Sequence, residues 1–261
     1  MAQISGFRRL QIAAIGLLCL CSAFMPMRKP TVVWMIGDST MCLYESSKAP
    51  LTGWGMPFAG FFNADLQFNN RAKGGRSTRT FLSEQRWLNV ADSLNQGDYV
   101  LIQFGHNDEA KEERYKDRYT AVADYKVNLA RFIQESRAKA AIPVLITPVS
   151  RMSFDKSRQT KETHAEYTTA VYEVAKMYGV PLIDLDRDSR ALYQKMGPEA
   201  TKKLFMQLEP GAHPNYPEGK KDNTHFNEFG ARKIAQLVLS EMKKQQLELC
   251  NYIVQPQTAK K

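Results

Sequence analysis

The chain has 261 residues, of which 43% are hydrophobic, and its formal net charge at pH 7 is +9. This length is compatible with one domain that buries a sizeable core, and the two cysteines after residue 30 are too few for a disulfide framework. The basic charge suits an anionic partner, such as a polyuronate, another cell-wall polymer, a membrane surface or a nucleic acid, and does not choose among them.

Residues 1–23 are expected to be a signal peptide. Arg8 and Arg9 precede an apolar run over residues 12–24, and small residues follow at positions 22 and 23. A membrane-spanning helix needs about 20 apolar residues. This run is shorter, and no later apolar stretch is long enough to span a membrane. An ordinary N-terminal helix is the alternative. We therefore expect an exported protein without a transmembrane span, located in the periplasm, at the cell surface or outside the cell.

A lipid anchor is a further option for this N-terminus. Cys19 and Cys21 are the candidate attachment sites, but large residues, Leu18 and Leu20, stand where such sites prefer a small one. Both a lipoprotein and a freely secreted protein remain open.

After residue 30, strand-like and helix-like segments alternate, which favours βαβ units and a mainly parallel sheet. The expected strands cover residues 32–36, 66–68, 99–104, 143–147 and 180–184. Pro181 lies in the last of these, and a proline within a strand favours an edge position.

Helical spacing of apolar residues predicts three longer helices. They cover residues 119–139, 161–177 and 227–244. Asn227 is the expected N-cap of the last helix, and the Pro/Gly-rich stretch 209–219 is expected to be a surface loop. No repeat or linker interrupts the pattern, so we expect one domain over residues 30–250, followed by a flexible tail over 251–261.

Four polar clusters interrupt this alternation. They cover residues 37–40, 70–77, 105–108 and 222–225. The first three follow the first three strands directly, and the carboxyl ends of parallel strands share the edge where ligands bind. The first three clusters should therefore open onto one edge of the sheet, and the fourth has to fold back to join them.

The clusters contain the groups that acyl transfer requires. A serine such as Ser39 is a weak nucleophile until a base takes its proton, and His225 can accept and return that proton. Asp222 is close enough on a turn to accept a hydrogen bond from the other ring nitrogen. Each group also has a structural explanation, because Ser39 could cap a following helix and the Asp–His pair could be structural.

Acyl transfer also requires donors for an oxyanion. The backbone N–H groups of Gly75 and Ser39 and the amide of Asn107 are the candidates. Gly74-Gly75 could instead be only a tight turn, and Asn107 a turn residue or helix cap. The glycine pair is not a P-loop, because the spacing to a Lys-Ser/Thr pair is absent.

Together and in this order, the clusters resemble those of the GDSL/SGNH hydrolases, and in detail those of the rhamnogalacturonan acetylesterases. The matching residues are Gly37-Asp38-Ser39-Thr40-Met41, Asn70, Ala72, Gly74-Gly75-Arg76-Ser77, Gln103-Phe104-Gly105-His106-Asn107-Asp108, Thr147-Pro148-Val149, Arg151, Asp222 and Thr224-His225-Phe226-Asn227. The resemblance covers about residues 31–245. It implies the flavodoxin-like SGNH hydrolase fold, a three-layer α/β/α sandwich with a five-stranded parallel sheet.

The resemblance also implies roles for individual residues. Ser39 would be the nucleophile, His225 the base and Asp222 the acid that orients it. Gly75 and Asn107 would form the oxyanion hole with the Ser39 N–H. Between the two adjacent glycines we choose Gly75, because the Gly-Arg-Ser spacing matches there.

We therefore expect a secreted carbohydrate O-acetylesterase that uses no metal or other cofactor and binds no nucleic acid. A lipase-type or thioesterase-type esterase is the first alternative. A metal-dependent phosphoesterase is the second, since Asp38, Asn107, Asp108, Asp222 and His225 include suitable metal-ligand types. A carbohydrate-binding protein with an inactive site is the third.

The expected substrate is an acetylated, anionic polysaccharide such as pectic rhamnogalacturonan. This expectation rests on basic residues near the clusters, namely Arg71, Lys73, Arg76, Arg79 and Arg151. The candidate substrate-binding residues are Arg76, His106, Arg151 and His213. The arginines could instead brace loops.

No histidine other than His225 has a comparable acidic partner in the sequence. His164 is expected within a helix. The sequence leaves open whether Cys42 and Cys250 pair and how many copies of the chain assemble.

Overall fold

The computed structural model describes residues 30–254. The predicted signal peptide over residues 1–23, both candidate lipid-attachment cysteines and residues 255–261 lie outside this range.

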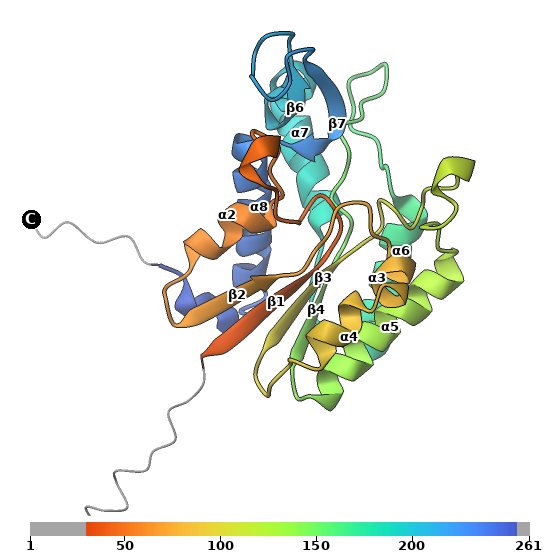
Figure 1. Ribbon diagram of the computed structural model, residues 1–261, viewed down its shortest axis with the longest axis vertical. Coiled ribbons are helices and arrows are strands. Elements are labelled where there is room, and N and C mark those ends of the chain that lie inside the picture. The colour runs from red at the N-terminus through yellow and green to blue at the C-terminus, as the bar shows by residue number, and fades with distance from the viewer. Residues whose placement is uncertain (1–29, 255–261) are drawn as a thin grey trace, which may run out of the picture. The chain divides into compact units, whose positions relative to one another are not determined.

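Five parallel strands form the central sheet, in the order β2-β1-β3-β4-β5 (Figure 1). They are β1 (Thr31–Gly37), β2 (Leu66–Asn70), β3 (Tyr99–Gln103), β4 (Ile142–Ile146) and β5 (Leu182–Ile183). All five predicted strands are confirmed, and β5 occupies an edge as Pro181 indicated. A hairpin of β6 (Phe205–Leu208) and β7 (Lys220–Phe226) makes a second, two-stranded sheet.

Helices cover both faces of the large sheet. The α-helices are α2 (Gly55–Phe58), α3 (Thr78–Ser83), α4 (Arg86–Ala91), α5 (Val122–Ala138), α6 (Ala165–Tyr178), α7 (Leu185–Thr201) and α8 (Glu228–Lys244). The 3₁₀ helices are η1 (Ser46–Lys48), η2 (Ala59–Phe61), η3 (Glu113–Tyr115), η4 (Lys202–Leu204) and η5 (Glu248–Tyr252). None of the helices within residues 30–254 is both long and apolar enough to cross a bilayer.

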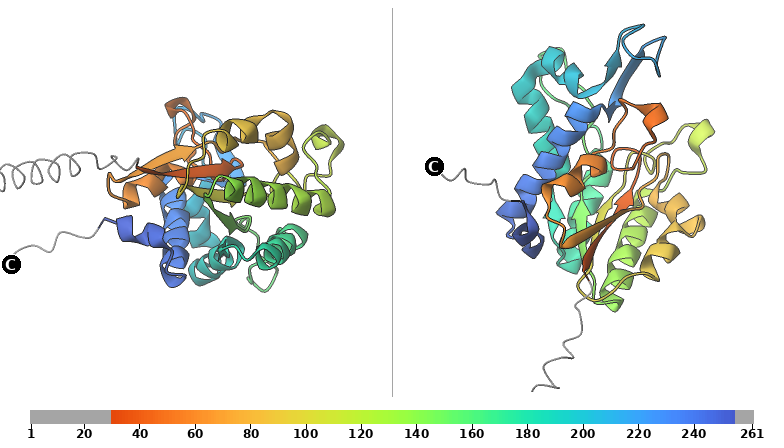
Figure 2. Two further views of the ribbon diagram at one scale, coloured as in Figure 1. Left: turned by 90° about the horizontal axis from the view of Figure 1, so that it is seen from below. Right: turned by 60° about the vertical axis from the view of Figure 1, so that its left-hand side comes forward.

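Alternate residues of each strand enter two separate cores, which makes the three layers. Val33 and Met35 of β1 pack with α2, α7 and α8, whereas Trp34 and Ile36 pack with α3, α4, α5 and α6. The period of two follows from the pleat, which directs successive side chains to opposite faces. The right-hand view of Figure 2 shows the α2–α8 side turned toward the viewer. The predicted three-layer sandwich is therefore confirmed.

The chain changes the direction in which it adds strands to the sheet after β2, so β1 and β3 flank a switch point where a ligand can bind. From β1 the chain goes first to its outer neighbour β2 and then crosses back to β3. Helices leave such a point in opposite directions, so a crevice opens at the carboxyl ends of the two strands. Gly37 of β1 lies in register with Gln103 of β3. The segments that follow these residues therefore emerge side by side.

The three predicted longer helices correspond to α5, α6 and α8. The Asn227 side chain accepts a hydrogen bond from the Gly230 N–H, so the predicted N-cap is correct. The sequence patterns do not predict α2, α3, α4, α7 or the hairpin. These missed helices are short or, in α7, interrupted where Gly197 takes φ 73° before Pro198. The 209–219 loop joins the two strands of the hairpin.

The domain extends beyond its predicted end at residue 250. Residues 251–254 were expected to begin a flexible tail, but Ile253 bridges to Phe62 and the Asn63 N–H donates to the Tyr252 carbonyl. Leu249 of η5 is fully buried. These contacts hold the segment on the edge of the domain as far as Val254.

Close packing of α8 against η4 predicts one stability effect. An added Cβ at Gly230 would lie 1.9 Å from the Leu204 carbonyl oxygen, whereas one at Gly60 would meet nothing within 4 Å. We expect Gly230→Ala to lower the free energy of unfolding by about 3 kcal/mol, as overpacking does. Gly60→Ala should change it by less than about 0.5 kcal/mol. Equal urea midpoints for the two variants would contradict this packing.

Candidate active site

Ser39 lies in a turn at the end of β1, and no helix follows it. The Asp38 carboxylate supports this turn by accepting from the Thr40 N–H at 2.9 Å and the Thr40 hydroxyl at 2.8 Å. Gln103 of β3 donates to Thr40 Oγ1 and accepts from the Trp54 indole. The helix-cap explanation for Ser39 is therefore wrong, and Asp38 supports the turn as expected.

Asp222 and His225 lie in a bulge of β7, which corrects the expectation of a simple turn. Phe226 pairs with Phe205 and Lys221 with Gln207, so β7 has three more residues between these pairs than β6. The extra residues leave the ladder and bend toward Ser39. Such a bulge re-aims side chains beside a site.

The three side chains form one line of hydrogen bonds. Ser39 Oγ lies 2.9 Å from His225 Nε2, and His225 Nδ1 lies 2.8 Å from Asp222 Oδ2. Asp222 Oδ1 accepts from the N–H groups of Thr224 and His225. Burial alone would raise the pKa of Asp222, but the hydrogen bonds and charge of His225 outweigh it, so this pKa is well below its usual value. The carboxylate is therefore ionised around neutral pH.

Asn107 follows β3 and points its amide toward the same edge. Its Nδ2 donates to the Arg76 carbonyl at 3.1 Å, and its Oδ1 accepts from Arg118 at 2.9 Å. An amide nitrogen has two hydrogens, so one remains for another acceptor. Arg118 also stacks on Tyr115, with its guanidinium carbon 4.2 Å from the ring centroid. Sequence reasoning missed Arg118, because only the return of the 109–121 loop brings it to Asn107.

The peptide that joins Gly74 and Gly75 lies beside Ser39. A Cβ added to Gly74 would lie 3.6 Å from Ser39 Cβ, whereas one on Gly75 would face Arg118. The Gly74 carbonyl accepts from the Arg76 guanidinium at 3.0 Å. Because a trans peptide directs its C=O and N–H to opposite sides, Arg76 also fixes the direction of the Gly75 N–H.

Two buried histidines have acidic partners that the sequence analysis did not find. His106 Nδ1 lies 3.3 Å from Asp38, and His164 Nδ1 lies 2.9 Å from Glu109. The two rings are in contact, with centroids 4.2 Å apart. Burial, then the neighbouring His164, lower the pKa of His106 to about 4, so it is neutral at pH 7. His164 precedes α6 rather than lying within it.

Arg151 braces the bulge of β7. It donates to Thr224 Oγ1 at 2.6 Å and to Glu109 at 2.9 Å. The Met152 N–H also donates to the Asn223 carbonyl. The loop after β4 therefore holds the bulge through both side-chain and backbone contacts.

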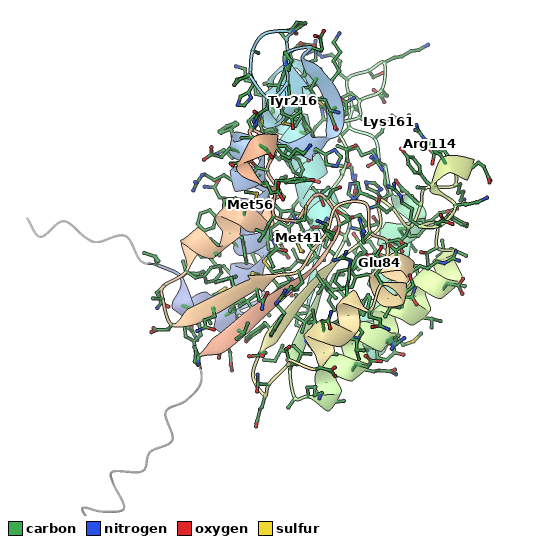
Figure 3. All side chains as sticks on the ribbon, viewed as in Figure 1. Met41, Met56, Glu84, Arg114, Lys161 and Tyr216 are labelled. Carbon is green, nitrogen blue, oxygen red and sulfur yellow. The ribbon has the colours of Figure 1, made fainter. Side chains whose placement is uncertain are left out.

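A cleft of about 770 Å³ opens at Ser39 and His225. Its charged lining residues are the acids Glu109, Glu112, Glu162, Glu166 and Asp222 and the bases Lys111, Arg118 and Arg151. Acids therefore outnumber bases, contrary to the expectation from the sequence. Figure 3 labels Arg114 of η3, whose neighbour Tyr115 lines the cleft.

Most of the basic residues near the clusters in sequence lie outside this cleft. Arg71, Lys73 and Arg79 are exposed elsewhere, and Arg76 pairs with Glu84. Of the candidate substrate-binding residues, His106 and Arg151 line the cleft. His213 does not line it, and its Nδ1 accepts from the Asn215 N–H within its own loop.

Cys42 and Cys250 are both free. Within residues 30–254, no three His, Cys, Asp or Glu side chains gather in a way that could hold a metal ion.

The sequence matches the model of the GDSL-like lipase/acylhydrolase family over residues 35–233, a range that includes all four polar clusters. It is 40% identical over 228 residues to the rhamnogalacturonan acetylesterase RhgT of Bacillus subtilis, covering 87% of this chain and 96% of that relative. It is 34% identical to the probable rhamnogalacturonan acetylesterase YesY of the same organism, covering 85% and 97%. The crystal structure of B. subtilis YxiM has a TM-score of 0.72 at 27% identity, covering 83% of this chain and 57% of that chain.

Asp108 connects two of the polar segments, and its burial should make the stability of the fold depend on pH. Its Oδ1 accepts from the N–H and hydroxyl of Thr78, at the start of α3. Burial, only partly offset by these hydrogen bonds, raises the pKa of Asp108 to about 7. In the unfolded chain an aspartate loses its proton near about pH 4. The contribution of Asp108 to stability therefore falls as the pH rises from about 4 to 7.

Asp108→Asn removes this titration, and the amide oxygen can keep both hydrogen bonds from Thr78. Its stability relative to wild type should increase from about pH 4 to 7, by up to about 1.4 kcal/mol per pH unit, and level off above. Urea denaturation across this range measures the difference. A difference that does not change with pH would contradict the raised pKa.

Proposed function

Because the chain belongs to the GDSL-like lipase/acylhydrolase family, we propose that it is a carbohydrate O-acetylesterase with a catalytic triad of Ser39, His225 and Asp222. The observation that carries the proposal is the line of hydrogen bonds from Ser39 Oγ through the His225 ring to Asp222, at the edge of a polar cleft. Two relatives of similar length support it, one named as a rhamnogalacturonan acetylesterase and one as a probable rhamnogalacturonan acetylesterase.

In this mechanism Ser39 Oγ attacks the acetyl carbonyl while His225 Nε2 takes the hydroxyl proton. The ionised Asp222 holds the other ring nitrogen and stabilises the imidazolium that forms. The intermediate then collapses, and the sugar hydroxyl leaves with the proton from His225. Water activated by His225 hydrolyses the acetyl-Ser39 ester, which releases acetate and restores the serine.

The oxyanion is held by the N–H groups of Ser39 and Gly75 and the amide of Asn107. Within the described residues, neither backbone N–H donates to a protein acceptor, so both are available. Asn107 is held in the donating orientation by Arg118 on its oxygen and the Arg76 carbonyl on its nitrogen. Donors fixed before the reaction need no reorganisation when charge develops.

The lining of the cleft favours a sugar ester over a lipid. Apart from the rings of Tyr115 and Tyr167, the apolar side chains that line it are those of Ala110 and Ala165. Long acyl chains bind in pockets with a large apolar surface. A lipase-type activity on long chains is therefore disfavoured.

The finer proposal is that the substrate is acetylated pectic rhamnogalacturonan and that the protein acts after export by its N-terminal sequence. The names of RhgT and YesY support the substrate. The basic net charge of the chain is compatible with an anionic polymer.

Removal of the nucleophile tests the proposed activity. Ser39→Ala should lower acetate release from acetylated rhamnogalacturonan by about 10⁶-fold, as in other triads. Ser93→Ala changes an exposed hydroxyl far from the site in sequence and should keep the wild-type rate. Near-wild-type release by Ser39→Ala would exclude the triad, and equal wild-type rates on acetylated xylan would exclude a preference for pectin.

Arg118 offers a second test, as a residue that positions Asn107. Loss of a whole oxyanion donor costs about 10²–10³ in kcat, so loss of its orienting partner should cost about tenfold. Arg118→Met should therefore lower kcat on 4-nitrophenyl acetate by about tenfold, with little change in KM. A loss confined to KM would contradict this role.

Arg114→Met is the matched control, because Arg114 also stacks on Tyr115, at 4.5 Å, and has an exposed side chain away from Asn107. It should keep the wild-type kcat. Equal losses in the two variants would mean that the effect comes from the Tyr115 stack.

A further inference from the structure

A second, smaller hollow adjoins the catalytic histidine on the hairpin side. It measures about 310 Å³ and its lining includes Tyr44, Lys48, Tyr216 and Lys220 together with Asp222 and His225. We call it the lysine hollow. Asp222 and His225 also line the large cleft, and the two hollows share no other lining residue. Figure 3 labels Tyr216 on the loop of the hairpin.

The walls of the lysine hollow are held together by hydrogen bonds. The Tyr216 hydroxyl donates to the Lys48 carbonyl at 2.9 Å, and the Asn215 amide donates to the Ala49 carbonyl at 2.9 Å. These bonds join the 209–219 loop to the η1 segment. The Tyr44 hydroxyl donates to the Ser39 carbonyl at 2.9 Å, which ties the opposite wall to the nucleophile.

The charges of the lysine hollow differ from those of the cleft. Within residues 30–254, Lys48 and Lys220 form no ion pair, whereas Arg151 in the cleft is paired with Glu109. Asp222 is occupied by His225. The lysine hollow is therefore lined by two lysines that have no acidic partner within this range, beside His225, while the cleft has an excess of acids.

The lining suits an acidic sugar. An ammonium group binds a carboxylate as a mobile point charge, so two lysines can reach one carboxylate without a fixed geometry. The tyrosine rings offer apolar faces with a polar edge, which suits the mixed surface of a sugar ring. A hollow of this size is too small for a long oligosaccharide and fits roughly one sugar unit.

We propose that the lysine hollow is a subsite that binds a uronate carboxylate of the polysaccharide while an acetyl group of the same chain reaches Ser39. This inference rests on the proposed acetylesterase function. It assigns recognition of the anionic polymer to Lys48 and Lys220, in place of the arginines that lie near the catalytic clusters in sequence.

The test compares the charged polymer with a neutral form of the same polymer. Acetylated rhamnogalacturonan is used with free uronates and after methyl esterification of the uronates, which removes their charge. The variant Lys48→Gln/Lys220→Gln should raise KM for the free-acid polymer about tenfold, as expected for the loss of two exposed charge contacts. On the methyl-esterified polymer its KM should match that of the wild type.

The matched control is Lys203→Gln/Lys221→Gln, which removes the same charge from exposed positions in η4 and β7 that do not line the hollow. It should keep the wild-type KM on both polymers. An unchanged KM in the Lys48/Lys220 variant, an equal rise in the control, or an equal rise on the neutral polymer would each overturn the subsite. A wild-type protein that releases no acetate from either polymer would instead contradict the proposed function, and the subsite with it.

Discussion

The contact between Ser39 Oγ and His225 Nε2 is the interaction on which the site depends, and it joins residues 186 positions apart. Ser39 is fixed by the buried strand β1 and by the Asp38–Thr40–Gln103 hydrogen bonds at its end. His225 reaches it only because β7 bulges out of its hairpin. Arg151 then holds that bulge from the loop after β4. The sheet supplies the edge, and polar contacts between loops supply the alignment.

Buried polar groups form much of the support behind this edge. Neutral His106 lies between Asp38 and His164, and His164 connects through Glu109 to Arg151. The hydrogen bonds that Glu109 accepts from His164 and Arg151 hold the segments of these residues in one arrangement. The network links the segments after β1, β3 and β4. Together with Asp108 and Thr78, it makes the loops of the site one connected unit.

The sequence predicts the features that depend on local patterns. Short apolar runs gave the five strands, and the polar residues at their ends gave the members of the site. The bulge of β7 was not predictable from the sequence, because it depends on the register with β6. The place of Arg118 beside Asn107 was not predictable either, because it depends on the path of the 109–121 loop. Basic residues close to the polar clusters in sequence were expected to line the cleft, and most of them do not. Arg71, Lys73 and Arg79 lie in or beside the 70–77 cluster yet do not line the cleft, whereas Lys48 and Lys220, far apart in sequence, line the same hollow.

Covalent labelling of the nucleophile tests the central claim most directly. An activated phosphonate ester forms a stable adduct with a serine that a neighbouring base activates, and peptide mass mapping locates the adduct. The account predicts one adduct per chain, on Ser39, with loss of acetate release, and no adduct in the Ser39→Ala variant. An adduct on another residue, or full activity in the labelled protein, would contradict the catalytic role of Ser39.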